Sequence, residues 1–235
     1  MRLDIHLTKH NNIQSRNKAN ELIKSKKVLV DGKIVTKPSF LVNGDENIAI
    51  ETDHFFVSRA AYKLKYFLED NDIKIKDKRA LDIGSSTGGF TQILLEYGIK
   101  EVTCVDVGDN QLHETIKEDK RIVLKENTDI REFYSTKQFS VVTCDVSFIS
   151  ILNIINDIDR LSSDEIIILY KPQFEVGRNI KRDSKGVVLD KEAIDFVQKE
   201  FLNSTKKLGW KLIVSNQSKL AGKSGNIEVL YYFKK

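Results

Sequence analysis

The chain has 235 residues, of which 40% are hydrophobic and 31% are charged, with 38 Lys and Arg against 34 Asp and Glu. The two cysteines, Cys104 and Cys144, lie in apolar runs and cannot form a disulfide scaffold. The sequence has no run of about 18 uncharged apolar residues that would form a spanning helix. Residues 1–10 carry charge and lack the apolar region of a secretory signal. We therefore expect a cytoplasmic protein with one large domain and a small companion.

Positive charge is concentrated near the N-terminus. Residues 1–40 carry 9 Lys and Arg against 3 Asp and Glu, whereas residues 41–235 carry 29 against 31. This asymmetry indicates a basic module beside a near-neutral body. On charge alone, a polyanion-binding surface and an ordinary solvated surface remain equally open.

The first 50 residues predict a small module of helix and hairpin. Ser15 is a suitable N-cap for a helix over residues 16–26, whose apolar residues form one stripe. The dipeptide Asp31-Gly32 lies between two β-prone runs and predicts a hairpin, because both residues tolerate the positive φ of a type I′ turn. The apolar stripe is Ala19, Leu22 and Ile23, and the expected strands are 28–30, 33–35, 40–42 and 47–50.

Three segments of this module resemble the S-four-type RNA-binding domain, named after a ribosomal protein. They are Met1-Arg2-Leu3-Asp4, Ser15-Arg16-Asn17-Lys18-Ala19 and Val28-Leu29-Val30-Asp31-Gly32-Lys33. The resemblance implies structured RNA as the ligand, held by phosphate contacts that do not read its sequence. A small dimerisation or packing domain remains the alternative. The candidate phosphate contacts are Arg2, Arg16, Lys18 and Arg59.

We place the first domain at residues 1–54 and the second at residues 55–235. Residues 51–57 contain neither Gly nor Pro, so we expect a short, ordered connection. From residue 58 onward, apolar strand-like runs alternate with helix-like segments, which favours an α/β fold with a mostly parallel, Rossmann-like seven-stranded sheet covered on both faces. The expected strands are 79–84, 102–107, 121–124, 139–146, 165–171, 212–214 and 227–233, and the expected helices are 90–97, 149–161 and 193–208.

A glycine-rich turn over residues 82–90 joins the first strand of this body to its first helix. Ser86 departs from the dinucleotide-binding pattern of glycines. Asp106 and Asp129 follow the next two strands, where carboxylates can accept ribose hydroxyls and an adenine amino group. Such acidic strand ends disfavour a phosphate-rich cofactor and favour S-adenosylmethionine, although helix caps or turns would also explain them. The predicted cofactor residues are Asp82, Gly84, Ser85, Ser86, Thr87, Gly88, Gly89, Phe90, Asp106, Val107, Asp129, Ile130 and Asp145, without a metal.

Four further residues are expected to share a pocket at the carboxyl edge of the sheet. Lys63 lies at the entrance to the second domain, Asp145 and Lys171 end the fourth and fifth strands, and Glu228 starts the last one. A lysine packed beside another lysine has a lowered pKa and can accept a proton, while the carboxylates hold the ammonium groups. This set suits methyl transfer to a ribose 2′-hydroxyl, a weak nucleophile that must lose its proton. The segment 145–148 lacks the proline of amino-directed methyltransferases.

The four residues resemble the Lys-Asp-Lys-Glu tetrad of RNA ribose 2′-O-methyltransferases. Together with residues 58–64, 81–90 and 171–175, they make the whole chain similar to the TlyA family, in which an S-four-type domain precedes an FtsJ-like, class I S-adenosylmethionine-dependent methyltransferase domain. The resemblance implies 2′-O-methylation of cytidine in ribosomal RNA, linked to susceptibility to capreomycin-type antibiotics. The short N-terminus resembles the class that modifies large-subunit (23S) rRNA only.

One departure from the family is Ala60-Ala61, where Gly-Gly is common. Two methyl groups there are expected to tighten the turn before Lys63 without abolishing activity. Phe148 and Phe174 follow strands, where they can stack on flipped bases or pack in the core.

The alternatives are a membrane-active haemolysin and a non-catalytic RNA-binding factor of ribosome assembly. The sequence lacks a spanning helix and an export signal, which argues against the first, and the intact tetrad argues against the second. We expect ribosomal RNA or a ribosomal subunit as the partner, neither a membrane nor DNA, and a monomer.

Overall fold

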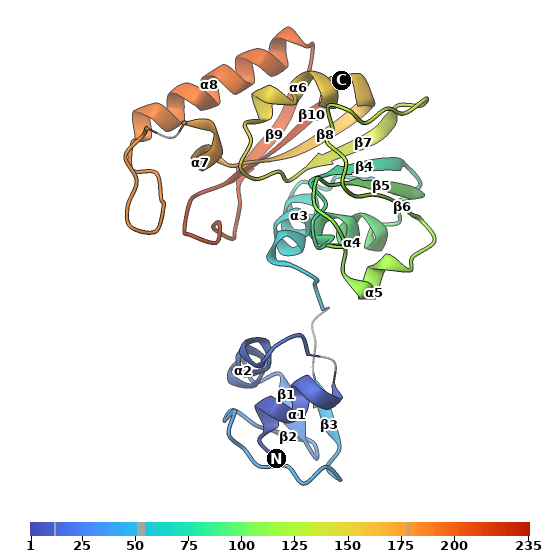
Figure 1. Cartoon of the computed structure of the whole chain (residues 1–235), viewed down its shortest axis with the longest axis vertical. Helices are drawn as coiled ribbons and strands as arrows, with labels where there is room; N and C mark the ends of the chain where they lie inside the picture. The colour runs from blue at the N-terminus through green and yellow to red at the C-terminus, as the bar shows by residue number, and fades with distance from the viewer. Residues whose placement is uncertain (12, 51–54, 178) are drawn as a thin grey trace. The chain divides into compact units, whose positions relative to one another are not determined.

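The computed structural model describes residues 1–11, 13–50, 55–177 and 179–235, which form two compact units, 1–55 and 56–235 (Figure 1). Most of the predicted linker, residues 51–54, lies outside the described residues, so its order stays a prediction. Within the described residues, no helix combines the length and apolar character needed to cross a bilayer.

Unit 1 packs two helices against a three-stranded antiparallel sheet of order β2-β1-β3. Helix α2 begins after Ser15, whose side chain accepts a hydrogen bond from the amide of Lys18 at 3.2 Å, as the sequence predicts. The hairpin is also confirmed: Asp31 and Gly32 have φ of 48° and 75° between paired strands. The elements are α1 (Leu3–His10), α2 (Arg16–Lys24), β1 (Val28–Val30), β2 (Lys33–Ile34) and β3 (Ile48–Ile50).

Two features of unit 1 differ from the sequence prediction. Helix α1 was not expected, because it has no side-chain N-cap and buries only a narrow set of residues that includes a charged one, Asp4. The strand expected over residues 40–42 is wrong, since only a single bridge between Leu41 and Arg2 forms there. The core contains Leu3, Leu7, Ile13, Ala19, Leu22, Ile23, Val28, Val30, Val35 and Val42.

Unit 2 is built on a seven-stranded sheet of order β6-β5-β4-β7-β8-β10-β9. The strands from β6 to β8 run parallel, and β10 runs antiparallel to both of its neighbours. This arrangement confirms the predicted α/β fold with a mostly parallel seven-stranded sheet. The strands are β4 (Arg79–Ile83), β5 (Glu101–Val105), β6 (Ile122–Lys125), β7 (Phe139–Cys144), β8 (Ser162–Tyr170), β9 (Lys211–Gln217) and β10 (Val229–Lys234).

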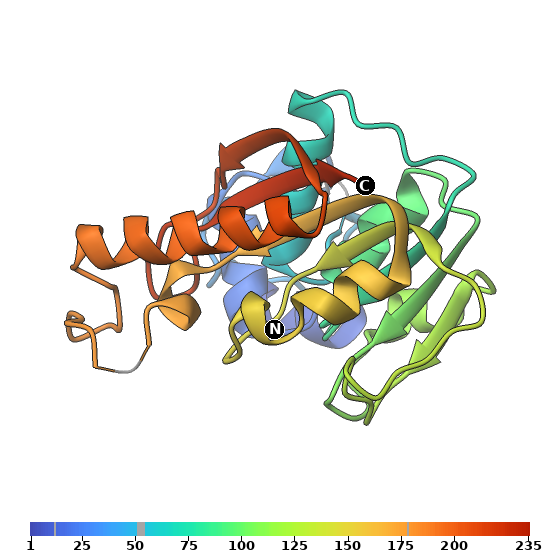
Figure 2. The same cartoon turned by 90° about the horizontal axis from the view of Figure 1, so that it is seen from above.

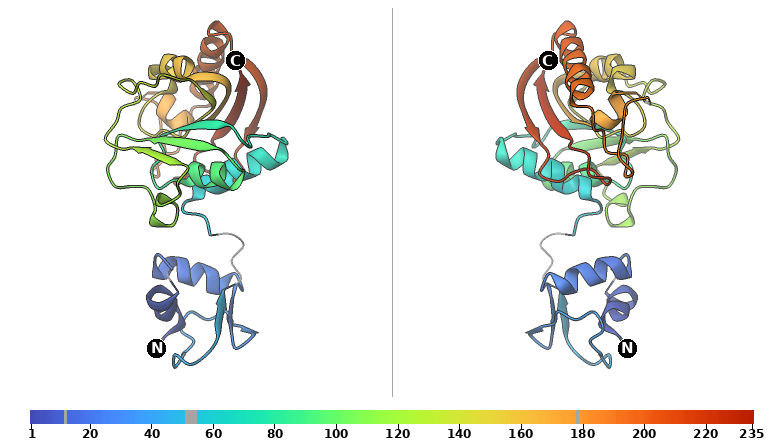
Figure 3. Two further views of the ribbon diagram at one scale, coloured as in Figure 1. Left: turned by 90° about the vertical axis from the view of Figure 1, so that its right-hand side faces the viewer. Right: turned by 90° about the vertical axis from the view of Figure 1, so that its left-hand side faces the viewer.

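Helices cover both faces of this sheet (Figures 2 and 3). Helices α6 and α8 lie over one face, where aromatic side chains of α8 and β10 such as Phe201, Tyr231 and Phe233 are fully or almost fully buried. Helices α3 and α4 pack together on the other face. The helices are α3 (Arg59–Asp70), α4 (Gly89–Glu96), α5 (Glu114–Lys117), the 3-10 turn η1 (Ile151–Asn153), α6 (Ile155–Leu161), α7 (Pro172–Glu175) and α8 (Lys191–Lys207).

The reversed direction of β10 decides where its first residues lie. In the antiparallel register Val229 pairs with Tyr170, the last residue of β8. Glu228 comes just before β10, and Lys171 comes just after β8. The antiparallel register therefore places Glu228 next to Lys171, at the carboxyl end of β8. If β10 were parallel to β8, Glu228 would instead lie at the amino ends of the parallel strands, away from Lys171.

Candidate active site

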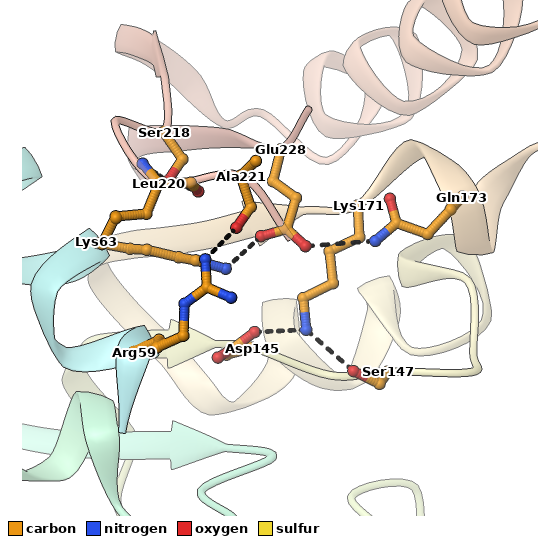
Figure 4. Close-up of polar contacts among 10 residues, drawn as sticks. All are labelled: Arg59, Lys63, Asp145, Ser147, Lys171, Gln173, Ser218, Leu220, Ala221 and Glu228. Carbon is orange, nitrogen blue, oxygen red and sulfur yellow. Dashed lines mark hydrogen bonds and ion pairs between the residues drawn. The ribbon is translucent and has the colours of Figure 1, made fainter. Parts of the chain in front are cut away.

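Two lysine–carboxylate pairs lie at the carboxyl edge of the sheet (Figure 4). Nζ of Lys171 lies 2.6 Å from Oδ1 of Asp145, and Nζ of Lys63 donates to Oε2 of Glu228 at 2.5 Å. Both lysines and Glu228 are almost completely buried. The structure thus brings together all four residues that the sequence predicts, although they come from four separate segments of the chain.

Each lysine has its own carboxylate, so neither positive charge is left without a partner in this buried place. Burial raises the pKa of Asp145, and the nearby Lys171 opposes that rise. An ammonium group held this way keeps a further donor position, because lysine has three N–H bonds. The arrangement can therefore bind a polar substrate atom and exchange a proton with it.

Two residues that the sequence analysis did not name form hydrogen bonds with the tetrad (Figure 4). Ser147 accepts from Nζ of Lys171 at 3.0 Å, and Nε2 of Gln173 donates to Oε1 of Glu228 at 3.2 Å. Both lie within three residues of a predicted catalytic residue. That proximity is a weak signal, since it does not show which way either side chain points.

A cavity of about 380 Å³ opens beside the tetrad, between the ends of β4, β5 and β7. Gly84 borders it with φ of 75°, and a Cβ there would lie 3.1 Å from the carbonyl oxygen of Asp145. Only glycine suits both this left-handed backbone and this close approach. Of the predicted cofactor residues, Gly84, Ser86, Asp106, Val107, Asp129, Ile130 and Asp145 line the cavity.

Two acidic residues of this cavity, Asp106 and Asp129, are held by other groups of the chain. Oδ2 of Asp106 accepts from the amide of Ser86 at 2.8 Å, and its Oδ1 accepts from the amide of Gly108 at 2.7 Å. Because each carboxylate oxygen has two lone pairs, Asp106 can still accept hydroxyl groups. Asp129 forms an ion pair with Arg131 at 2.6 Å, which lowers the pKa of that carboxyl to about 2.

A second cavity of about 460 Å³ is lined by the remainder of the glycine-rich turn and by the start of α3. Ser85, Thr87, Gly89 and Phe90 line it together with both lysines of the tetrad. A third, of about 660 Å³, is lined by Lys63, Lys171, Phe174, Glu228 and others. The tetrad thus borders both the cofactor-sized cavity, through Asp145, and the wide one, through Lys63, Lys171 and Glu228.

Two predicted cofactor residues do not border these cavities. Asp82 is completely buried, and its two carboxylate oxygens accept hydrogen bonds from Thr91 at 2.6 Å and Thr143 at 2.8 Å. Asp82 faces α4 and lines none of these cavities, so its contact with the cofactor stays a prediction. Burial raises the pKa of Asp82 to about 6. A Cβ on Gly88 would point at Ile116 and away from the cavities.

The expectation for Ala60-Ala61 is also wrong in its structural part. Both residues lie within the first turns of helix α3, not in a turn before Lys63. They pack against α4, where a Cβ on Gly89 would lie 3.0 Å from the amide nitrogen of Ala61. The alanines therefore set the distance between two helices.

The candidate RNA contacts have partners within the chain. In unit 1, Arg2 and Arg16 donate to the buried carboxylate of Asp4 at 3.0 and 2.7 Å, and the hydrogen bond from Arg2 lowers the pKa of that carboxyl to about 2. Lys18 pairs with Glu21 on the same helix. In unit 2, Nη2 of Arg59 donates to the carbonyl oxygen of Ala221 at 2.9 Å.

Phe148 and Phe174 form an aromatic pair at the mouth of the wide cavity, with ring centroids 5.0 Å apart. Phe148 is 91% exposed and has φ of 66°, a backbone conformation that is strained for a residue with a Cβ. Core packing therefore does not explain Phe148. The pair is a candidate surface for stacking on a base.

The chain resembles known proteins over both units. Residues 56–235 match the FtsJ-like methyltransferase family, and residues 1–48 match the S4 domain. The 23S rRNA (cytidine-2′-O)-methyltransferase TlyA of Campylobacter jejuni is 47% identical over 99% of each chain. The 16S/23S rRNA (cytidine-2′-O)-methyltransferase TlyA of Mycobacterium tuberculosis is 34% identical over 99% of this chain and 89% of that one. A solved structure from Streptococcus thermophilus that carries a hemolysin name has a TM-score of 0.72 at 28% identity, covering 100% of this chain and 88% of that one.

These matches confirm the predicted family, the methyltransferase activity and S-adenosylmethionine as the cofactor. The hemolysin name occurs within the same family and does not mark a separate class of protein. The chain belongs to the FtsJ-like methyltransferases, as a member of the TlyA family with an N-terminal S4 domain.

Proposed function

We propose that this chain methylates the ribose 2′-hydroxyl of a cytidine in ribosomal RNA. The observation that carries the proposal is the pair of ion pairs, Lys171–Asp145 and Lys63–Glu228, whose residues line both a cofactor-sized cavity and a wider one. A buried, paired lysine at that point can take the proton of a hydroxyl group. The C. jejuni and M. tuberculosis relatives carry names with this specificity.

When bound, S-adenosylmethionine supplies an electrophilic methyl group on its sulfonium. Lys171, as a neutral amine, takes the proton of the 2′-hydroxyl and becomes an ammonium ion, and Asp145 neutralises that charge and holds the lysine in place. Lys63, held by Glu228, donates a hydrogen bond to the ribose and fixes the orientation of the attacking oxygen. Positioning provides most of the rate enhancement, and the base contributes about 10²–10⁴-fold.

The cofactor residues divide by the part of the ligand that they suit. Asp106 and Val107 would hold the ribose, and Asp129 and Ile130 would hold the adenine. The carboxylate of Asp106 keeps acceptor capacity toward the cavity, and Gly84 leaves room for close approach, so the residues fit this ligand. The residues proposed for the remainder of the cofactor are Ser85, Ser86, Thr87, Gly89 and Phe90.

For the RNA, we propose a first domain at residues 1–54 and a catalytic domain at residues 55–235. Arg2, Arg16, Lys18 and Arg59 would contact phosphates through the donors that their internal partners leave free, since guanidinium groups have five. The proposed substrate is large-subunit (23S) rRNA in assembled particles, because the 23S-specific relative matches over 99% of both chains. The protein would act as a cytoplasmic monomer and affect capreomycin-type susceptibility.

The test is transfer of a tritiated methyl group to 30S, 50S and 70S particles, with the modified nucleotide mapped by mass spectrometry. We expect 2′-O-methylcytidine in 50S particles and a loss of about 10²–10⁴-fold in Lys171→Ala. Lys199→Ala, a change of an exposed lysine on α8, serves as the control with unchanged activity. Absence of methylation on every particle would refute the proposed function, and equal rates in wild type and Lys171→Ala would refute the base.

A further inference from the structure

Ser147 lies at the point where the three cavities of the site meet. It lines the cofactor-sized cavity, the one at the glycine-rich turn and the wide one. Its hydroxyl accepts a hydrogen bond from Nζ of Lys171 at 3.0 Å, and the same nitrogen lies 2.6 Å from Asp145 (Figure 4). Two acceptors from one loop thus act on one lysine.

The loop that carries Ser147 is anchored at both ends. At its start, the amide of Asp145 donates to the carbonyl oxygen of Ile83 at 3.0 Å, extending the pairing of β7 with β4. At its end, the half-buried carboxylate of Glu175 accepts from the hydroxyl of Ser150 at 2.5 Å and from the amide of Ile151 at 3.0 Å. Because Glu175 follows Lys171 by four residues, this contact fixes the loop to the segment that carries the lysine.

The geometry of an amine makes this double contact informative. A lysine that is to accept a proton has two N–H bonds and one lone pair at tetrahedral positions. If one N–H bond donates to Ser147 and the other points toward the carboxylate of Asp145, with which Lys171 forms an ion pair, the lone pair points along the remaining direction. A lysine with only one acceptor can rotate about that hydrogen bond, and its lone pair is then aligned for only part of the time.

We propose that Ser147 is a positioning residue that orients the lone pair of Lys171 toward the target hydroxyl. This inference rests on the proposed function. It predicts that the hydroxyl of residue 147 acts through Lys171 and not on the substrate. It also predicts that removal of the hydroxyl lowers kcat without weakening the binding of either substrate.

The experiment compares Ser147→Thr with Ser147→Val, two side chains of the same shape that differ by the hydroxyl. The Thr variant should keep a kcat within about threefold of wild type, and the Val variant should lose about tenfold, or about 1.4 kcal/mol in the barrier. KM for the particles and the Kd for S-adenosylmethionine, measured by calorimetry, should stay within about twofold. Thr136→Val, the same change at an exposed residue in the loop before β7, is the control for the substitution itself.

A double-mutant cycle separates positioning from direct contact. In the Lys171→Ala background, measured with enzyme in excess over particles, Ser147→Ala should cause no further loss of rate. If Ser147→Ala caused the same loss of rate in the Lys171→Ala background as in wild type, the inference would be overturned. A rise in KM at unchanged kcat would also overturn it, and so would equal kcat values in the Thr and Val variants. Melting temperatures show whether each variant is folded. If only one of Ser147→Thr and Ser147→Val folds, the kcat of that variant is compared with that of wild type and still tests the proposal. A wild-type protein that does not methylate particles would instead refute the proposed function.

Discussion

Asp82 offers a quantitative test of how a buried carboxylate affects stability. It is completely buried between Thr91 and Thr143, and burial raises its pKa from 3.8 to about 6. A raised carboxyl pKa means that the folded state binds the proton more tightly than the unfolded state. The stabilisation that comes from protonated Asp82 is fully present below pH 3.8, the pKa in the unfolded chain. It is lost as the pH rises through about 6, the pKa in the folded protein.

The magnitude follows from the size of the shift. At about 1.36 kcal/mol for each pKa unit, the ionised form of Asp82 costs about 3 kcal/mol at neutral pH. Asp82→Asn removes the charge, and its amide can exchange hydrogen bonds with both threonine hydroxyls. The difference in unfolding free energy between variant and wild type should therefore favour the variant at about pH 8, and it should shrink by about 1.4 kcal/mol at about pH 5.

The assay is urea unfolding followed by the fluorescence of Trp210, the single tryptophan of the chain, which is buried in the core of unit 2. Because all other titrating groups occur in both proteins, the difference isolates Asp82. A difference that does not change between the two pH values would refute the reasoning about burial. The Kd for S-adenosylmethionine should stay within about threefold, and a much larger loss would instead support direct contact with the cofactor.

Two further predictions concern the cofactor cavity and the helix contact. Asp106→Ala should weaken S-adenosylmethionine binding by about tenfold or more in calorimetry, through the loss of charged hydrogen bonds. Asp109→Ala, in the exposed loop nearby, should not, and equal affinities for the two variants would contradict the assignment. Gly89→Ala should destabilise unit 2 by about 1–3 kcal/mol, because its Cβ would lie 2.0 Å from Oγ of Ser58 and 3.0 Å from the amide nitrogen of Ala61. A Trp210 unfolding curve identical to wild type would contradict that packing.

The strands of unit 2 could be predicted from the sequence because their physical cause is local. Apolar runs such as 165–171 are long enough to be buried on both faces, and β8 (Ser162–Tyr170) indeed contains that run except for its last residue. The turn at Asp31-Gly32 was predictable for the same reason, since positive φ is a property of those two residues. In contrast, α1 depends on contacts with distant residues, among them the pairing of Asp4 with Arg16.

Side-chain directions could not be predicted in the same way. Asp82 and Asp106 both lie at strand ends near glycines, yet one faces α4 and the other borders the cofactor-sized cavity. Strand alternation does not explain the difference, because Asp82 is in register with Cys104, two residues before Asp106. Instead, residue 82 lies within β4, where its side chain is fixed by the strand, whereas residue 106 lies just beyond β5, where the chain leaves the sheet. Asp129 shows a further limit: Arg131 is two residues away, but only the folded loop turns its guanidinium back onto the carboxylate.

The tetrad depends on one topological feature that sequence patterns do not contain. Lys63, Asp145 and Lys171 would lie near one edge in any parallel sheet entered by α3, but Glu228 joins them only because β10 runs antiparallel to β8. With that reversal, the register of Val229 with Tyr170 places a carboxylate beside Lys171, and Lys63 then neutralises it from α3. A buried carboxylate without such a partner would be costly. Strand β10 therefore does more than extend the sheet toward the edge strand β9, since its direction determines whether the second lysine of the site has a counter-ion.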